Sequence, residues 1–339
     1  MGGMQWIDQT FASVPPGLSK PALAEAMLAT RSLGLARQDI AVQAWAKAPF
    51  AAALPPGVRA VVAPAEEELC LAQRLGFAAL RVDCALAGSI GALGRAAEAV
   101  RLARRLKLAT TLFVLDAASL SVREKTAVGE FCGANPDVGL AAGDWHGGLF
   151  PLRVPAFVAE VARLSAGPVS WVFSNRYDVA TANARAAWQS GARELAVAVG
   201  GGAFAAWEEL VLLAQREVAV ELPPKLAARC RALLALLGRP VDRRKAVLGC
   251  DIFAHESGLH VDGVAKAPAL YEAFAPETVG AARKIVVGKH SGMAAVQSKL
   301  RGLGLERSLA SAPLVTAIRR AAVVKRRALT DEELRTLVA

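Results

Sequence analysis

The feature of this sequence that most constrains its fold is a regular alternation of short β-type runs with longer helical patterns, from the N-terminus to about residue 215. Alternating strands and helices indicate a parallel sheet, and eight strand–helix units are the number that closes a (β/α)8 TIM barrel. The eight runs of strand type are Gln5–Thr10, Asp39–Gln43, Val58–Ala63, Ala79–Cys84, Thr110–Leu115, Val138–Ala142, Val169–Phe173 and Glu194–Val199.

Helical stretches follow most of these runs. Examples are Lys20–Leu33, Ser89–Leu106, Val122–Cys132 and Ala180–Gln189. In Ser89–Leu106 the apolar residues recur at helical spacing while charged residues mark the opposite side. An open, doubly wound sheet is the alternative architecture, but no GxGxxG motif follows the first strand.

The pattern changes after Gln215, and Pro223-Pro224 breaks the chain. A helix is expected from there to about Leu237, and the stretch from Met293 to the end reads as helices. Thr330 is the expected N-cap of the last helix, because acidic residues follow it directly. We therefore expect a barrel over residues 1–220 and a mostly helical C-terminal linker or lid subdomain with terminal helices over residues 221–339.

Composition excludes several classes of protein. The longest uncharged stretches, such as Leu195–Trp207, are shorter than the roughly 20 residues that cross a bilayer. The N-terminus has no basic region followed by an apolar run, so no signal peptide is expected. Five cysteines without CxxC spacing argue against a disulfide framework or a zinc ribbon. These observations predict a cytoplasmic protein without membrane contact.

The formal net charge is +10, and much of the excess lies late in the chain. Such an excess attracts anions, and an acyl-CoA is a possible ligand. Basic residues at helical spacing are more often a solvated face, and no aromatic residues are interleaved for base stacking. The sequence therefore predicts no nucleic-acid partner.

The most specific segment runs from Phe253 to Gly292 and contains three of the four histidines of the chain. It includes His255 and His260, with Ser257-Gly258 between them, and Tyr271. A lone histidine is usually structural, but a concentration of His and Tyr provides groups suited to general acid–base work.

This segment resembles the linker subdomain of the homocitrate synthase and isopropylmalate synthase family, most closely the homocitrate synthases associated with nitrogen fixation. The likeness is near-continuous from Gly249 to Gly292 and weaker but collinear over the barrel. It implies condensation of acetyl-CoA with a 2-oxo acid, such as 2-oxoglutarate, on a divalent metal at the C-terminal mouth of the barrel. It also implies a dimer in which the subdomain of one protomer reaches over the barrel of the other.

The resemblance assigns acid–base roles to His260 and Tyr271. It also assigns substrate binding to Asn175, which is the residue that remains of the family's His-x-His-Asn-Asp motif on the seventh strand. The run Lys289-His290-Ser291-Gly292 has two interpretations, contact with acyl-CoA phosphates or a cap of the next helix, and under the first Lys289 is a substrate-binding residue. Because the sequence ends without a leucine-sensing domain, we expect the homocitrate branch of the family.

The barrel departs from the family pattern wherever the metal and the oxo acid should bind. The family's first strand ends in DTTLRDGEQ, whereas residues 8–16 read DQTFASVPP. The substrate arginine becomes Ala12 and the metal-binding aspartate becomes Ser13. The remaining altered positions are Pro15 for a glutamate, Ala41 for a glutamate, Trp145 for a threonine, Val172 and Ser174 for two histidines, and Gly200-Gly201-Gly202 for a loop with a further asparagine ligand.

These losses bear on the chemistry. A divalent cation needs several oxygen or imidazole donors, which alanine, valine and proline side chains lack. Without the cation, the condensation loses a Lewis acid worth several kcal/mol. We therefore expect no metal ligands and no cofactor, and we leave open whether the chain is an enzyme.

Three hypotheses follow. In the first, the chain is a pseudoenzyme that forms a homodimer, or a heterodimer in which His260 and Tyr271 complete the site of an intact homocitrate synthase homologue. In the second, it is an active acyl-CoA enzyme with a relocated site. In the third, it is a non-catalytic binding protein. The relocated site would use Asp83, Asp116, Asp144 and His146, at or just beyond strand ends where barrel enzymes place catalytic groups; the alternative is that they are ordinary turn formers.

Overall fold

The computed structural model describes residues 4–15, 17–86, 88–89, 91–256, 263, 267–306 and 309–339. The chain divides into two compact units. The barrel unit is Met1–Pro223 with Cys230–Pro240, and the C-terminal unit is Pro224–Arg229 with Val241–Ala339. Helix α9 (Leu226–Leu236) contributes residues to both units.

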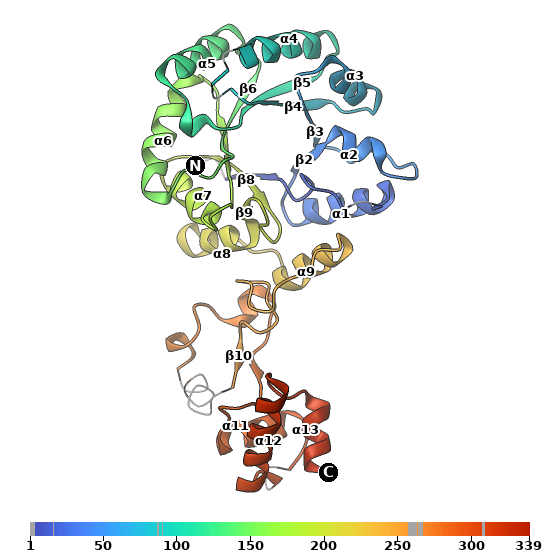
Figure 1. Ribbon diagram of the computed structural model, residues 1–339, viewed down its shortest axis with the longest axis vertical. Helices are drawn as coiled ribbons and strands as arrows, with labels where there is room; N and C mark the ends of the chain where they lie inside the picture. The colour runs from blue at the N-terminus through green and yellow to red at the C-terminus, as the bar shows by residue number, and fades with distance from the viewer. Residues whose placement is uncertain are drawn as a thin grey trace. The chain divides into compact units, whose positions relative to one another are not determined.

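The barrel unit is a closed parallel barrel, which confirms the predicted fold class (Figure 1). Strands β1 to β8 pair in chain order, and β1 pairs with β8 to close the ring. A short strand, β9 (Ala205–Ala206), pairs with β8. The closing strands are β1 (Gln5–Asp8), β2 (Arg37–Ala41), β3 (Val58–Val62), β4 (Ala79–Cys84), β5 (Ala109–Val114), β6 (Gly139–Asp144), β7 (Val169–Phe173) and β8 (Glu194–Ala198).

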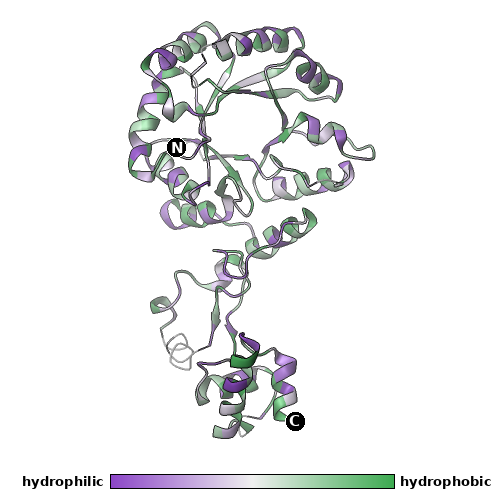
Figure 2. Cartoon of the chain, viewed as in Figure 1, coloured by the Kyte–Doolittle hydropathy of each residue, from purple (hydrophilic) through white to green (hydrophobic). Residues whose placement is uncertain are grey.

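The helices of the barrel unit surround these strands (Figure 1). Helix α4 shows why they form, since Ala92, Ala96, Val100 and Ala103 recur at helical spacing and all are buried. Figure 2 shows hydrophobic and hydrophilic residues alternating along the helices, as expected for amphipathic helices that expose one face to solvent. The helices are α1 (Lys20–Ser32), α2 (Val42–Lys47), α3 (Glu66–Arg74), α4 (Gly91–Arg105), α5 (Val122–Ala134), α6 (Val154–Val161), α7 (Ala180–Gln189) and α8 (Trp207–Val218).

The second strand differs from its prediction. It covers Arg37–Ala41 rather than Asp39–Gln43, because Val42–Lys47 already forms helix α2. The apolar Val42 suits a strand or a helix, and the sequence pattern alone does not separate the two. The shift matters for the site, because it places Asp39 in the middle of the strand.

The described residues of the C-terminal unit form the small parallel sheet of β10 (Ala254–His255) and β11 (Lys284–Ile285), followed by three α-helices. Its core joins side chains from all three helices, including Val296, Ile318 and Leu334. The helices are α11 (Met293–Gly302), α12 (Ala312–Lys325) and α13 (Asp331–Val338). Thr330 caps α13 as predicted, in a reciprocal capping box with Glu333.

No helix in the described part of the chain is both long enough and apolar enough to cross a membrane.

Candidate functional site

Apolar side chains from β5 to β8 and the residues that follow them pack together in the barrel unit. We call this cluster the apolar plug; its buried members are Phe113, Ala141, Val172, Ala196, Ala198 and Phe204, with Ala12 and Leu115 packed against them. The ring of Trp145 lies against Phe204, with 6.1 Å between the ring centroids. Gly143 makes room for Phe113, because an added Cβ there would lie 2.7 Å from the Phe113 ring. The plug is therefore closely packed.

The plug includes two positions where the family has a functional side chain. Ala12 replaces the arginine that binds the oxo acid, and Val172 replaces a histidine. Val172 is 3% exposed and contacts the plug, and Ala12 packs against its surface. Ser13 is exposed and its backbone carbonyl accepts a hydrogen bond from Arg239. Ser174 is buried, and its hydroxyl accepts a bond from the Arg176 amide at 3.4 Å. The donor set of this region therefore does not fit a divalent cation.

The other half of the barrel interior holds a buried ion-pair network that sequence reasoning missed. Asp39 accepts two hydrogen bonds from Arg59, at 2.8 and 3.0 Å, and one from Arg81 at 3.1 Å. Arg81 also donates to both carboxylate oxygens of Asp83, at 2.8 and 3.1 Å. The amide of Gln9 links the network, donating to Asp39 at 2.7 Å and accepting from Arg81 at 2.9 Å.

The charges of this network balance internally. Burial acts to raise the pKa of Asp39, but the guanidinium groups of Arg59 and Arg81 outweigh it and hold that pKa below 3.8. Burial raises the pKa of Asp83, which Arg81 only partly offsets. Arg81 also lies 4.7 Å from the centroid of the Phe113 ring, so the network borders the apolar plug. Both carboxylates are thus engaged by arginines rather than free to bind a metal.

A sequence signal for this network does exist. Arg59 interrupts the otherwise apolar strand β3, and Arg81 lies within β4 two residues before Asp83. Strands of a parallel barrel are buried on both faces, so a charge in mid-strand requires a buried partner.

Asp8 is the one acidic residue retained from the family's first-strand motif, and it is the last residue of β1. Its side chain is fully buried, and one carboxylate oxygen accepts a bond from the Thr10 amide at 2.8 Å. The other oxygen has no hydrogen-bond partner among the described residues. Burial raises the pKa of Asp8 from 3.8 to about 6, against the lowering effect of Thr10, Thr30 and Gln38.

Three of the four residues considered for a relocated site come together beyond β5 and β6. The Asp116 carboxylate lies 2.5 Å from Nδ1 of His146 and accepts the His146 backbone amide at 2.9 Å. The backbones of Asp144 and Asp116 form an isolated antiparallel β-bridge. The Asp144 carboxylate, however, accepts hydrogen bonds from the backbone amides of Gly148 and Leu149, at 3.0 and 2.9 Å. Asp83 belongs instead to the ion-pair network.

This arrangement is a histidine–aspartate pair rather than a metal centre. The His146 side chain is 75% exposed and that of Asp116 is 11% exposed, so the carboxylate orients an imidazole that faces solvent. Burial raises the pKa of Asp144, and its two oxygens are occupied by the loop that they hold. In the described ranges, no three His, Cys, Asp or Glu side chains are grouped so that they could hold a metal ion.

Asn175 is engaged in its own loop. Its side-chain carbonyl accepts the Ala180 amide at 3.1 Å, at the start of α7, and its Nδ2 donates to the Gly202 carbonyl at 3.1 Å. The Gly200 amide donates to the buried Glu208 carboxylate at 3.0 Å. The glycine run therefore binds a carboxylate of the chain itself. The assignment of Asn175 to substrate stays a prediction.

In the C-terminal unit, His260 lies outside the described residues. Tyr271 is 42% exposed and its ring lies against Gly263, where an added Cβ would be 2.3 Å from the hydroxyl. The neighbouring Glu272 carboxylate is 3% exposed and accepts two bonds from Arg283, at 2.9 and 2.7 Å. His255 Nε2 lies 3.5 Å from the same carboxylate. Tyr271 thus directly precedes Glu272, which is paired with Arg283, and its acid–base role stays a prediction.

Lys289 follows β11 and is exposed. It lines a cleft in the C-terminal unit, while Gly292, the last residue of the Lys289-His290-Ser291-Gly292 run, is the N-cap of α11, as the capping interpretation of that run expects.

Comparison with known proteins supports the resemblance. Residues 247–326 match the family model described as homocitrate synthase post-HMGL domain-like. Homocitrate synthase 1 of Nostoc sp. is 38% identical over 179 residues, which cover 50% of this chain and 48% of the relative. 2-Isopropylmalate synthase 2 of Caldanaerobacter subterraneus is 40% identical over 169 residues, covering 47% of this chain and 44% of the relative. The chain therefore spans about half the length of the curated relatives it matches.

Solved structures support the barrel. Hydroxymethylglutaryl-CoA lyase from Pseudomonas aeruginosa superposes with a TM-score of 0.56 at 13% identity, covering 70% of this chain and 94% of the lyase. The carboxyl transferase domain of pyruvate carboxylase from Rhizobium etli gives 0.52 at 12% identity, covering 70% and 47%. At these identities the likeness shows the fold alone.

The post-HMGL domain match, the two kinds of synthase among the relatives and the closed barrel agree with one another. The chain is thus similar to homocitrate synthases and 2-isopropylmalate synthases over about half of its length.

Proposed function

We propose that this chain is a homocitrate synthase-like pseudoenzyme subunit whose C-terminal unit completes the active site of an intact homologue. The family reaction is the condensation of acetyl-CoA with 2-oxoglutarate to homocitrate, as in nitrogenase cofactor synthesis. The observation that carries the proposal is the apolar plug, which occupies the part of the barrel where the resemblance expects a metal and an oxo acid.

The plug removes both parts of the family's catalytic apparatus. Valine and alanine side chains cannot replace the oxygen and imidazole donors of a divalent cation. Ala12 also cannot form the bidentate contact that an arginine makes with a carboxylate. Asp39 and Asp83 in the barrel interior are paired with arginines. A lone chain of this kind is expected to lack the family's metal-dependent activity.

The C-terminal unit supports the partner role. The family match covers residues 247–326, which include His260 and Tyr271, the two residues to which the resemblance assigns acid–base roles. The Tyr271 side chain is 42% exposed and can reach a group presented by another protein. The resemblance implies that this subdomain acts on the barrel of a dimer partner, and we propose a cytoplasmic heterodimer of that kind.

A complementation assay tests this proposal. An intact homologue whose tyrosine matching Tyr271 is changed to phenylalanine provides the metal site but lacks its own acid–base hydroxyl. Mixing it with the present chain should restore homocitrate formation, and Tyr271→Phe in this chain should lower the restored rate about 100-fold. The matched control is Tyr177→Phe, which alters the only other tyrosine and should leave the restored rate unchanged.

Two results would refute the partner role. One is a stable mixed complex in which the wild-type chain restores no activity. The other is restored activity that does not depend on Tyr271 or His260.

The pair of Asp116 and His146 supports a second candidate, an acyl-CoA enzyme with a relocated site. A buried carboxylate 2.5 Å from Nδ1 leaves Nε2 of an exposed imidazole directed toward solvent, as a general base requires. Under this alternative the chain alone converts an acyl-CoA and a 2-oxo acid, and His146→Gln abolishes the conversion. Absence of turnover by the purified chain with acetyl-CoA and a panel of 2-oxo acids would eliminate it.

A further inference from the structure

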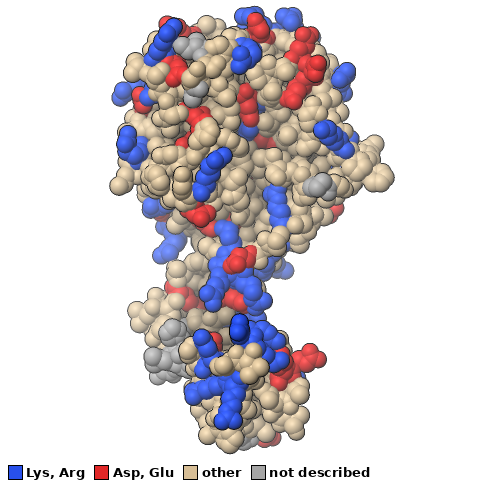
Figure 3. Space-filling view, in the orientation of Figure 1, with Lys and Arg blue, Asp and Glu red and all other residues tan. Residues whose placement is uncertain are grey.

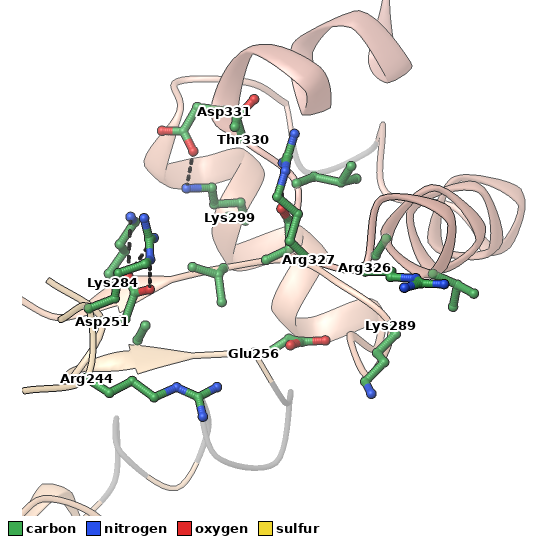
Figure 4. A pocket seen from close by; sticks show the side chains of 17 residues that line it. Arg244, Asp251, Glu256, Lys284, Lys289, Lys299, Arg326, Arg327, Thr330 and Asp331 are labelled. Carbon is green, nitrogen blue, oxygen red and sulfur yellow. Dashed lines mark hydrogen bonds and ion pairs between the residues drawn. The ribbon is translucent and has the colours of Figure 1, made fainter. Parts of the chain in front are cut away.

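The C-terminal unit contains a cleft of about 1520 Å³, formed by residues far apart in the sequence (Figure 4). Arg244 precedes β10, Lys284 lies on β11, Lys289 follows β11, and Arg326 is the C-cap of α12. All the described residues that line the cleft belong to this one unit. The volume is ample for a small organic ligand, since typical ligand pockets measure about 300 to 1,000 Å³.

The cleft is strongly cationic. Figure 3 shows Lys and Arg side chains gathered over the visible face of this unit. Seven of the described lining residues are basic and three are acidic. The basic residues are Arg243, Arg244, Lys284, Lys289, Lys299, Arg326 and Arg327, and the acidic residues are Asp251, Glu256 and Asp331.

Ion pairs account for some of these charges. Arg243 binds Asp251 through two hydrogen bonds at 2.6 and 3.1 Å, and Lys299 lies 2.6 Å from Asp331. Arg327 is paired with Glu333, at 2.8 and 2.6 Å.

Within the described residues, the third acidic residue of the lining does not pair with a cation. Glu256 accepts the backbone amide of His290 at 2.8 Å.

Three cations of the lining have no side-chain partner among the described residues: Arg244, Lys289 and Arg326. Each is exposed and each comes from a different segment of the unit. Like charges that converge on one concavity repel one another, and a bound anion relieves that repulsion. Arginine is suited to phosphate because its planar donors can contact two oxygens at once, while lysine adds a point charge.

We propose that this cleft binds a small organic molecule that carries two or more phosphate groups. Two phosphate groups together carry about three to four negative charges at neutral pH, which matches the excess of basic over acidic residues in the lining. The cleft also has an apolar part, formed by Val286, Val323 and Leu329, on which the organic portion of the ligand can pack. The proposal stands apart from the partner role of Tyr271, because it concerns neither acid–base chemistry nor a second protein.

Isothermal titration calorimetry of the full chain tests it, with inorganic pyrophosphate and ATP as probes. Both should bind one per chain, with an affinity that falls as the salt concentration rises. The triple substitution Arg244→Ala, Lys289→Ala and Arg326→Ala should weaken both probes about tenfold or more, because it removes the charge-assisted contacts. Tighter binding of ATP than of pyrophosphate would support the apolar contact as well.

The matched control removes two arginines and one lysine from exposed positions outside the cleft, by Arg301→Ala, Arg320→Ala and Lys47→Ala. It keeps the same net charge as the test variant and should change the affinity less than twofold. An equal loss in both variants would refute a localised site, since it would reflect overall charge. Absence of binding up to millimolar pyrophosphate and ATP would also refute it, and so would binding of a DNA oligonucleotide alone, which would indicate a nucleic-acid surface.

Discussion

Replacing Asp8 with asparagine tests how much the buried carboxyl group of Asp8 lowers the free energy of unfolding of the barrel when it is ionised. The Asp8 side chain is fully buried, and one of its oxygens lacks a hydrogen-bond partner in the described structure. Asparagine has nearly the same shape, carries no charge at any pH, and can still accept the Thr10 amide through its carbonyl.

The magnitude follows from the pKa. Burial raises the pKa of Asp8 from 3.8 to about 6, so between these values the folded chain holds a proton that the unfolded chain has lost. The free energy of unfolding therefore falls as pH rises through this window, and it stays lower above it. A difference of about two pKa units corresponds to about 3 kcal/mol. Asp8→Asn lacks this dependence, so relative to wild type it should gain about 3 kcal/mol between pH 4 and pH 7.5.

Urea unfolding followed by tryptophan fluorescence measures this gain in the barrel unit alone, because all six tryptophans lie in it. Comparing the variant with wild type at two pH values cancels differences in packing that do not depend on pH. The control is Asp137→Asn, because the bond from Arg104 holds the pKa of Asp137 below 3.8 and its effect should not grow above pH 4. A variant whose advantage is the same at both pH values would refute the reasoning.

Three further substitutions test other parts of the structure. Asp39→Asn leaves Arg59 and Arg81 without their shared counter-charge in the barrel interior and should lower the free energy of unfolding by about 3 to 5 kcal/mol, measured by urea unfolding. Phe204→Ala opens a cavity in the apolar plug and should cost about 3 to 5 kcal/mol, with a change in Trp145 emission. Thr330→Ala removes the N-cap of α13 and should cost about 1 kcal/mol, seen as faster hydrogen exchange confined to that helix. Unchanged stability in any of them would contradict the assigned contact.

The alternation of strands and helices was sufficient to predict the barrel, because each strand–helix unit carries its own local pattern of apolar residues. The predicted bounds of Ala79–Cys84 and Val169–Phe173 are confirmed without change. The second strand was shifted by two residues because Val42 and Trp45 are buried on a helix rather than in the sheet. Local apolar content predicts that such residues are buried, but not in which element.

The site was harder to predict, because it depends on contacts between strands far apart in the sequence. The loss of ligand side chains at Ala12 and Val172 could be seen from the family pattern, but their joint packing with Phe204 could not. The pairing of Asp39 with Arg81 joins β2 to β4, and its geometry depends on the register of both strands. Asp83 was grouped with Asp116 because both lie near strand ends, and only the structure assigns it to Arg81.

Binding of Mn²⁺ to the purified chain, measured by electron paramagnetic resonance, tests the central claim most directly. Wild-type protein should show no stoichiometric Mn²⁺ site, because Asp39 and Asp83 are paired with arginines and the plug offers no donor atoms. The variant Ser13→Asp, Val172→His and Ser174→His, which restores family ligands, serves as the comparison. One tightly bound Mn²⁺ per wild-type chain, lost when Asp39 or Asp83 is changed to asparagine, would contradict the account.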